Sequence, residues 1–165
     1  MINYREPAGE EMQSQRDFLL SMEYANWIHG LTSWQVYFTG TFRWPASLDS
    51  AVRGFKKFMM KQYHECNYFA AFEPFPSGYG WHNHSLIERP GRDIYCKEMW
   101  SAWFQRFGRN KVELIRSRED VASYASKYCV KEAIGKGWYE VHVWKPSCQP
   151  GALLNFPEGL AGVSK

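Results

Sequence analysis

Two histidines and a carboxylate near the middle of the chain have the residue types of a divalent-metal site. His82 and His84 stand two apart in the stretch WHNHSLIE, and Glu73 precedes them across a glycine-containing segment. In a β-strand, the period of two would place both imidazoles on one face and Asn83 on the other. A hairpin turn over 77–80 would bring Glu73 beside His82. The spacing therefore predicts a metal clamp, and ordinary polar side chains on an exposed strand are the alternative.

A repeated tyrosine–lysine unit supplies a second kind of chemistry. In YASKYCVK, Tyr124 and Tyr128 are four apart, and Lys127 and Lys131 each follow three residues after a tyrosine. Residues four apart share a helical face. A phenol has a pKa of about 10, so a nearby ammonium would favour the nucleophilic phenolate and offset phosphate charge. The pattern is typical of nucleophiles that attack a phosphodiester, but half-buried tyrosines with snorkelling lysines would look the same.

Periodicity and turn residues predict the elements that must position these groups. We expect strands over 33–44, 67–76, 81–90, 111–117 and 138–146, and helices over 47–64, 95–108 and from 117 to about 134. The order β-α-β-β-α-β-α-β indicates an α+β split-βαβ sandwich. We expect one sheet with helices on one face and the other face partly open.

Local signals refine the helices. Ser47 is the expected N-cap of the first, and Ser117 with Asp120 forms an approximate capping box for the third. In the second, four aromatic residues are predicted on one face: Trp100, Trp103, Phe104 and Phe107. We expect an N-terminal arm or helix over 1–32, a nuclease-sized domain over 33–146, and a tail or linker over 147–165.

Composition describes a globular chain. With 165 residues, 45% hydrophobic and 18% aromatic, it has the size of one domain and is not intrinsically disordered. The net charge of +3 permits a polyanionic partner without demanding one. Some aromatic rings could stack on nucleobases, and an aromatic-rich core is the equal alternative.

The cysteines and the apolar runs give expectations about compartment. No Cys-x-x-Cys pair occurs, which argues against structural zinc and indicates free thiols in a reducing compartment; the cysteines are Cys66, Cys96, Cys129 and Cys148. The polar N-terminal stretch lacks a signal-peptide pattern, and no apolar run has the length of a membrane span. We therefore expect a cytoplasmic protein of a bacterial or archaeal host cell, with no membrane partner.

Taken together, three ordered motifs resemble those of the HUH endonucleases, specifically rolling-circle replication initiators (Rep proteins). FTGTF at 38–42 is similar to the first motif, HNHSLIE at 82–88 to the second, and YASKYCVK at 124–131 to the third in its two-tyrosine form. That form is typical of initiators from single-stranded DNA phages and related plasmids. Asn83 departs from the hydrophobic residue usual between the histidines. The resemblance spans about 34–144 and implies a five-stranded antiparallel sheet flanked by helices.

The resemblance also implies roles. Mg²⁺ or Mn²⁺ would sit on the two histidines, with Glu73 as a third ligand. Tyr128, with Lys131 beside it, would attack single-stranded origin DNA first and give a 5′-phosphotyrosine link and a free 3′-OH. Tyr124, with Lys127, would perform the second transfer that terminates a round.

DNA is expected to cross the open sheet face. The candidate contacts are Arg43, Trp44, Tyr79, Trp81 and Arg89. No phosphate-binding loop of the Gly-x-x-x-x-Gly-Lys type occurs, so a host helicase and polymerase are expected partners unless a helicase domain has been removed.

Two other functions fit the same features. A plasmid relaxase or HUH transposase would share the superfamily, but relaxases usually carry a third clustered histidine and an N-terminal tyrosine, and only Tyr4 lies near the start. A non-catalytic single-stranded nucleic-acid-binding module could use the same fold, although the RNA-recognition consensus is absent.

Overall fold

The computed structural model describes residues 9–117, 119–122, 124 and 138–144. Its elements are α1 (Gly9–Leu31), β1 (Val36–Gly40), α2 (Leu48–Gln62), β2 (Asn67–Pro74), β3 (Trp81–Glu88), α3 (Cys96–Arg106), β4 (Asn110–Leu114) and β5 (Trp138–His142). A further helical segment covers 119–122 and 124 and is called the tyrosine helix below. The expected α+β order is confirmed, and the leading helix α1 is longer than the short one expected.

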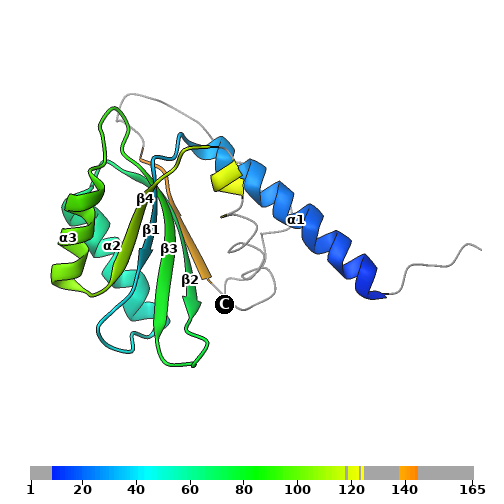
Figure 1. Ribbon diagram of the computed structural model, residues 1–165, viewed down its shortest axis with the longest axis horizontal. Coiled ribbons are helices and arrows are strands. Elements are labelled where there is room, and N and C mark those ends of the chain that lie inside the picture. Colours follow the sequence, from blue (N-terminus) through cyan, green and yellow to red (C-terminus); the bar gives the residue numbers. More distant parts are fainter. Residues whose placement is uncertain (1–8, 118, 123, 125–137, 145–165) are drawn as a thin grey trace, which may run out of the picture.

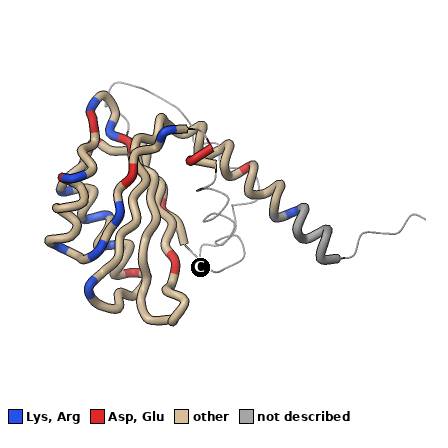
Figure 2. The backbone as a smooth tube through the Cα atoms, viewed as in Figure 1, with Lys and Arg blue, Asp and Glu red and all other residues tan. Residues whose placement is uncertain are grey.

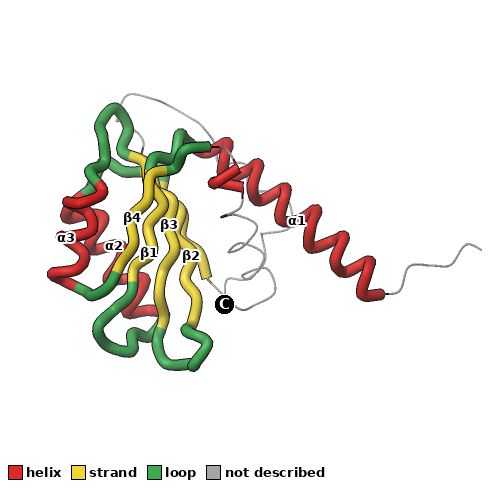
Figure 3. Tube along the Cα trace, viewed as in Figure 1, coloured by secondary structure: helices red, strands yellow, loops and turns green. Residues whose placement is uncertain are grey.

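All five strands form one antiparallel sheet. Their order is β4-β1-β3-β2-β5, with β3 at the centre (Figures 1 and 3). The hairpin of β2 and β3 pairs Glu73 with His82 and Ala71 with His84. On the other side of β3, β1 pairs Thr39 with His84. The predicted five-stranded antiparallel sheet is therefore confirmed, and its register brings the first and second sequence motifs side by side.

Helices α2 and α3 cover one face of the sheet (Figure 3). Phe55 and Phe58 of α2, Trp103 of α3 and Phe38 of β1 are fully buried there. The indole N–H of Trp103 donates to the carbonyl of Thr41 at 3.1 Å, so the largest core side chain also satisfies its polar atom. This aromatic core makes the sheet a rigid support for whatever the opposite face carries.

Gly40 lies where this core approaches the sheet most closely. A Cβ at that position would meet Asn83 Oδ1 at 2.6 Å and the rings of Phe38 and Trp103 at 2.7 Å. Because real Cβ atoms do not come so close, glycine is required by space at the end of β1.

The second face is partly covered by α1 and the tyrosine helix. Ile28 of α1 and Val121 of the tyrosine helix pack with Phe69 and Leu86 of the sheet. The expectation of helices on one face only is therefore wrong, because these apolar strand residues need cover of their own. Figure 1 shows the N-terminal half of α1 running away from the sheet, so only its C-terminal part contributes to this layer.

Helix α3 departs from its expected aromatic face. Met99 and Trp103 are buried, four residues apart, and Phe107 follows at the same spacing. Trp100 and Phe104 lie on the adjacent stripe, 43% and 39% exposed, and stack on each other with centroids 4.9 Å apart. One helical stripe fits against the sheet, so the prediction that all four aromatic residues share the buried face is wrong.

The predicted caps are present. Ser47 caps α2, and its side chain accepts from the Ser50 N–H. Ser117 Oγ accepts from the Asp120 N–H at 3.2 Å, while Asp120 Oδ2 accepts from the Ser117 N–H at 3.1 Å. This reciprocal capping box, with Asp in place of Glu, fixes the start of the tyrosine helix.

Candidate metal centre

The histidine pair lies on the face of the sheet that α1 and the tyrosine helix partly cover. His82 and His84 alternate with Asn83, which is fully buried on the opposite face. Their ring centroids are 4.8 Å apart with an interplanar angle of 76°. The period of two therefore brings both imidazoles together as the sequence predicts.

Glu73 joins the histidines from the neighbouring strand. It sits directly opposite His82 in the β2–β3 register, and its Oε1 lies 3.2 Å from His84 Nε2. One donor atom from each of the three residues lies within 4.8 Å of the others. The structure thus brings together the three residues expected to hold a metal ion.

The donor set fits a divalent cation. An ion about 2.0–2.2 Å from imidazole nitrogen and carboxylate oxygen holds its donors roughly 3 Å apart. The 3.2 Å between Glu73 and His84 already has this value, and the widest separation of 4.8 Å would close with small side-chain rotations. Two imidazoles and one carboxylate on one side of an ion leave its other positions open. Glu73, His82 and His84 therefore form a group that could bind a metal ion and an additional ligand.

The surroundings of Glu73 also favour a cation. Figure 2 shows the charged residues mainly on helices and loops, with few on the central strands. Strands β1, β2 and β3 contain two formally charged residues, Glu73 and Glu88. The side chains of Glu73 and His84 are only 14% and 11% exposed. A carboxylate this far from water needs a positive partner, which a metal ion or a protonated His84 would provide.

Two hydroxyl groups from β1 hold the other nitrogen of His84. Tyr37 Oη and Thr39 Oγ1 each lie 3.2 Å from His84 Nδ1. Because Nε2 faces Glu73, this arrangement aims the Nε2 lone pair at the donor cluster and keeps the proton on Nδ1 when Nε2 binds a metal. Sequence reasoning missed both residues. Their alternation in the expected strand was visible, but the neighbour of that strand in the sheet was not.

Phe75 positions the ring of His82. The two rings are stacked with centroids 4.5 Å apart and an interplanar angle of 22°. Phe75 is held by the hairpin turn, because its N–H donates to the Gly80 carbonyl and its carbonyl accepts from the Gly78 N–H. Both glycines have positive φ, 73° for Gly78 and 91° for Gly80, which glycine adopts without strain. The turn therefore orients one metal-ligand candidate as well as joining the strands.

Tyr124 lies beside the histidines but is buried. Its side chain is 3% exposed, and its hydroxyl donates a short hydrogen bond to the backbone carbonyl of His84. Its ring contacts Tyr37 and Phe69 edge-on, with centroids 5.1 Å and 6.1 Å away. Three other predicted site residues lie outside the described residues: Tyr128, Lys127 and Lys131.

Two of the expected DNA contacts pack beside α3. The Arg43 guanidinium donates to the Phe104 carbonyl at 2.6 Å and lies over the Phe104 ring. Trp44 is 45% exposed and packs on Phe107, which belongs to the core under α2 and α3. Neither residue is therefore placed over the histidine pair.

The remaining three candidates divide between a turn and the same core. Trp81 packs against the core under α2 and α3, and the Arg89 guanidinium lies over the ring of Tyr63. Tyr79, at the tip of the β2–β3 hairpin, is 75% exposed. The structure thus does not gather the five residues on one face, and Tyr79 is the candidate on the hairpin that carries the histidines.

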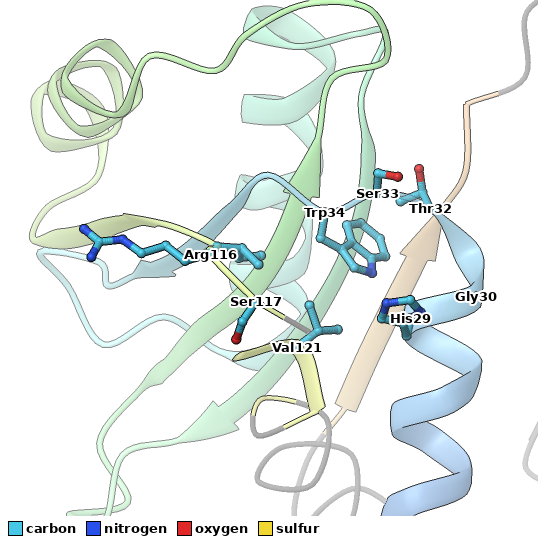
Figure 4. Close-up of a pocket in the computed structure, with 9 residues that line it drawn as sticks. His29, Gly30, Thr32, Ser33, Trp34, Arg116, Ser117 and Val121 are labelled. Atoms are coloured by element: carbon cyan, nitrogen blue, oxygen red, sulfur yellow. The ribbon is translucent and has the colours of Figure 1, made fainter. Parts of the chain in front are cut away.

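A separate cavity of about 550 Å³ lies between the end of α1 and the loop after β4 (Figure 4). Trp34 forms part of its wall, with His29 from α1 and Val121 from the tyrosine helix. Figure 4 shows the Arg116 side chain directed away from Trp34. Glu73, His82 and His84 do not line this cavity, so it is distinct from the candidate metal centre.

Comparison with known proteins assigns the domain. A family of replication-associated proteins, described by the name ORF2, matches residues 35–133, which is more than half of the chain. The matched range includes β1, the β2–β3 hairpin and the tyrosine helix. Neither a curated protein nor a solved structure gives a significant match. No helix within the described residues combines the length and apolar character needed to cross a bilayer.

Proposed function

The chain belongs to this family of ORF2 replication-associated proteins, and from this premise we propose that it is a site-specific endonuclease and strand transferase of rolling-circle replication. Family membership supports a role in initiating replication and DNA as the partner. The proposal adds the chemistry, in which a tyrosine cleaves and rejoins single-stranded origin DNA. The observation that carries it is the cluster of Glu73, His82 and His84 beneath the tyrosine helix.

Glu73, His82 and His84 would hold the divalent ion. When bound, the ion would polarise the oxygens of the scissile phosphate and offset the charge that develops on them. Of the two ions expected, Mn²⁺ suits the two imidazoles better, because Mg²⁺ prefers oxygen ligands and retains its waters. Tyr37 and Thr39 would orient His84 by accepting the Nδ1 proton.

Tyr128 would supply the nucleophile. Its phenolic oxygen attacks the phosphorus, a bond from phosphorus to the tyrosine oxygen forms, and the bond to the 3′ oxygen breaks. The phenol loses its proton and the departing 3′ oxygen takes one up, which leaves a 5′-phosphotyrosine and a free 3′-OH. Attack of a 3′-OH on the phosphotyrosine reverses these steps, so one ester replaces another and no water is consumed. Lys131 and Lys127 would offset the phosphate charge on either side.

The DNA strand would enter over the hairpin and the exposed edge of the histidine face. Tyr79 is placed to stack on a base near the hairpin tip. Lys111 on the edge strand β4 pairs with Thr39, which in turn pairs with His84, so the three lie in one row across the sheet. The Lys111 side chain is 67% exposed and could contact a phosphate next to the scissile one.

The other four candidate residues contact protein on or beside the α2 and α3 side of the sheet. These are Arg43, Trp44, Trp81 and Arg89. They would reach DNA only where the strand passes round the edge of the sheet.

A metal-dependent covalent adduct tests the proposal. The full chain is incubated with Mn²⁺ and a fluorescent single-stranded DNA library with a randomised core, labelled at the 3′ end so that the label stays on the linked product. We expect a labelled protein band on a denaturing gel that EDTA abolishes. His82→Ala and His84→Ala should remove the band. His64→Ala is the matched control, because His64 is 69% exposed and pairs with Glu65 away from the cluster.

The control separates the enzyme from a binding module. A non-catalytic single-stranded DNA-binding domain would shift the DNA on a native gel and give no denaturation-resistant band. An adduct that forms equally with EDTA or in His84→Ala would show that the cluster has no part in the chemistry.

A further inference from the structure

The tyrosine–lysine repeat is symmetric in sequence, but the environment of its first tyrosine is that of an internal side chain. Tyr124 is 3% exposed, and Val121, one turn earlier, is 4% exposed. Both belong to the apolar cluster that includes Tyr24 and Ile28 of α1 and Phe69 of β2. A nucleophile must reach the phosphorus of a charged, hydrated DNA strand, and this layer separates the Tyr124 ring from solvent.

The hydroxyl of Tyr124 is engaged by the metal-ligand strand. It donates to the backbone carbonyl of His84, the residue whose Nε2 faces Glu73. A phenol that gives its proton to a carbonyl is held in place and is not available for attack while that bond persists. The ring also packs edge-on against Tyr37, whose own hydroxyl lies 3.2 Å from His84 Nδ1. Tyr124 therefore contacts His84 through its main chain and through a residue bound to its ring.

We propose that Tyr124 is a positioning residue that fastens the tyrosine helix to the main chain of His84, and that Tyr128 alone forms the bond to DNA. This inference rests on the proposed nicking function. If the helix expected from the sequence continues to about residue 134, Tyr128 follows Tyr124 by one turn. The anchored first tyrosine would then set the height of the second above the metal ligands.

Two readouts distinguish this assignment from two alternating nucleophiles. The first is adduct mapping in the Mn²⁺ and DNA-library assay by tandem mass spectrometry. We expect the phosphodiester link on residue 128 in the wild type and in Tyr124→Phe, where it should form more slowly, and no link in Tyr128→Phe. A link on Tyr124 in Tyr128→Phe would overturn the proposal and leave the nickase function standing.

The second readout needs neither DNA nor turnover. The affinity for Mn²⁺ alone is measured by electron paramagnetic resonance titration. Because Tyr124→Phe keeps the ring contacts and removes one hydrogen bond to the ligand strand, we expect roughly three- to tenfold weaker binding. Tyr95→Phe is the matched control, since Tyr95 is 62% exposed at the start of α3, and its affinity should equal that of the wild type.

The outcomes separate the two levels of the proposal. Unchanged Mn²⁺ affinity in Tyr124→Phe would overturn the positioning role even if Tyr128 carries the link. If the wild type forms no link on any tyrosine, the nickase function fails, and the Mn²⁺ titration alone decides whether Tyr124 positions His84.

Discussion

The hydroxyl groups of Tyr37 and Thr39 should control how tightly the candidate centre holds its metal. Each oxygen lies 3.2 Å from the same nitrogen, His84 Nδ1. A single N–H makes one strong hydrogen bond at a time, so either hydroxyl can replace the other. We therefore expect Tyr37→Phe or Thr39→Val alone to weaken Mn²⁺ binding roughly twofold, about 0.5 kcal/mol.

Removing both hydroxyls should have a larger effect than the sum of the single changes. With no acceptor left from β1, His84 can rotate or place its proton on Nε2, the atom that would bind the ion. Loss of such outer partners typically weakens metal binding 10- to 100-fold, or about 1.4–2.7 kcal/mol. The two positions share one partner, so this non-additivity is itself a prediction of the geometry.

The assay is a Mn²⁺ titration at fixed pH, monitored by electron paramagnetic resonance, on the wild type, both single variants and the double variant. Thermal unfolding of each protein without metal checks that the fold is retained, and Tyr95→Phe controls for the loss of an exposed phenol. A double variant that binds Mn²⁺ within twofold of the wild type would refute the reasoning. So would a single variant that already shows the full loss, because then only one hydroxyl would matter.

Three further predictions concern the scaffold. Gly40→Ala should lower the free energy of unfolding by about 1–3 kcal/mol in urea titrations, because its Cβ has no space, whereas Gly30→Ala on the exposed side of α1 should not lower it. Burial, aided by the Lys56 ammonium, lowers the pKa of His142 from its usual 6.5, so the unfolded state takes up a proton first as the pH falls. Stability should therefore decline below about pH 6.5, and His142→Gln should show a shallower decline between pH 7 and 5; an unchanged slope would contradict this. Burial raises the pKa of Cys66 to about 12, so peptide mapping after iodoacetamide treatment at pH 8 should find it alkylated only when the chain is unfolded.

The histidine pair and its carboxylate could be predicted because their geometry is local. A strand period of two fixes the common face of His82 and His84, and a short hairpin fixes Glu73 opposite His82. The capping box at Ser117 is equally local, since its two hydrogen bonds join residues three apart. These features need only one or two neighbouring elements to be correct.

The partners of His84 from β1 could not be predicted in the same way. Tyr37 and Thr39 reach it because β1 lies next to β3, and 47 and 45 residues separate the bonded pairs along the chain. Strand order in a sheet depends on which faces the helices cover, which is a property of the whole fold. The cover that α1 gives to the second face escaped prediction for a related reason, because its need arises from Phe69 and Leu86 on strands far along the chain.

The tyrosine repeat shows why identical spacing does not imply identical chemistry. Tyr124 and Tyr128 have the same sequence surroundings, each with a lysine three residues later. The sheet breaks this symmetry, because Tyr124 meets the His84 carbonyl and an apolar layer. If only Tyr128 links to DNA, one chain can nick and rejoin, but it cannot make a second cleavage while still linked to the first end. A second copy would have to supply that nucleophile. Mixing Tyr128→Phe, which retains the metal ligands, with a His84→Ala chain, which retains Tyr128, should therefore leave both cleavages deficient, whereas wild-type chains added in excess over a preformed adduct should release it.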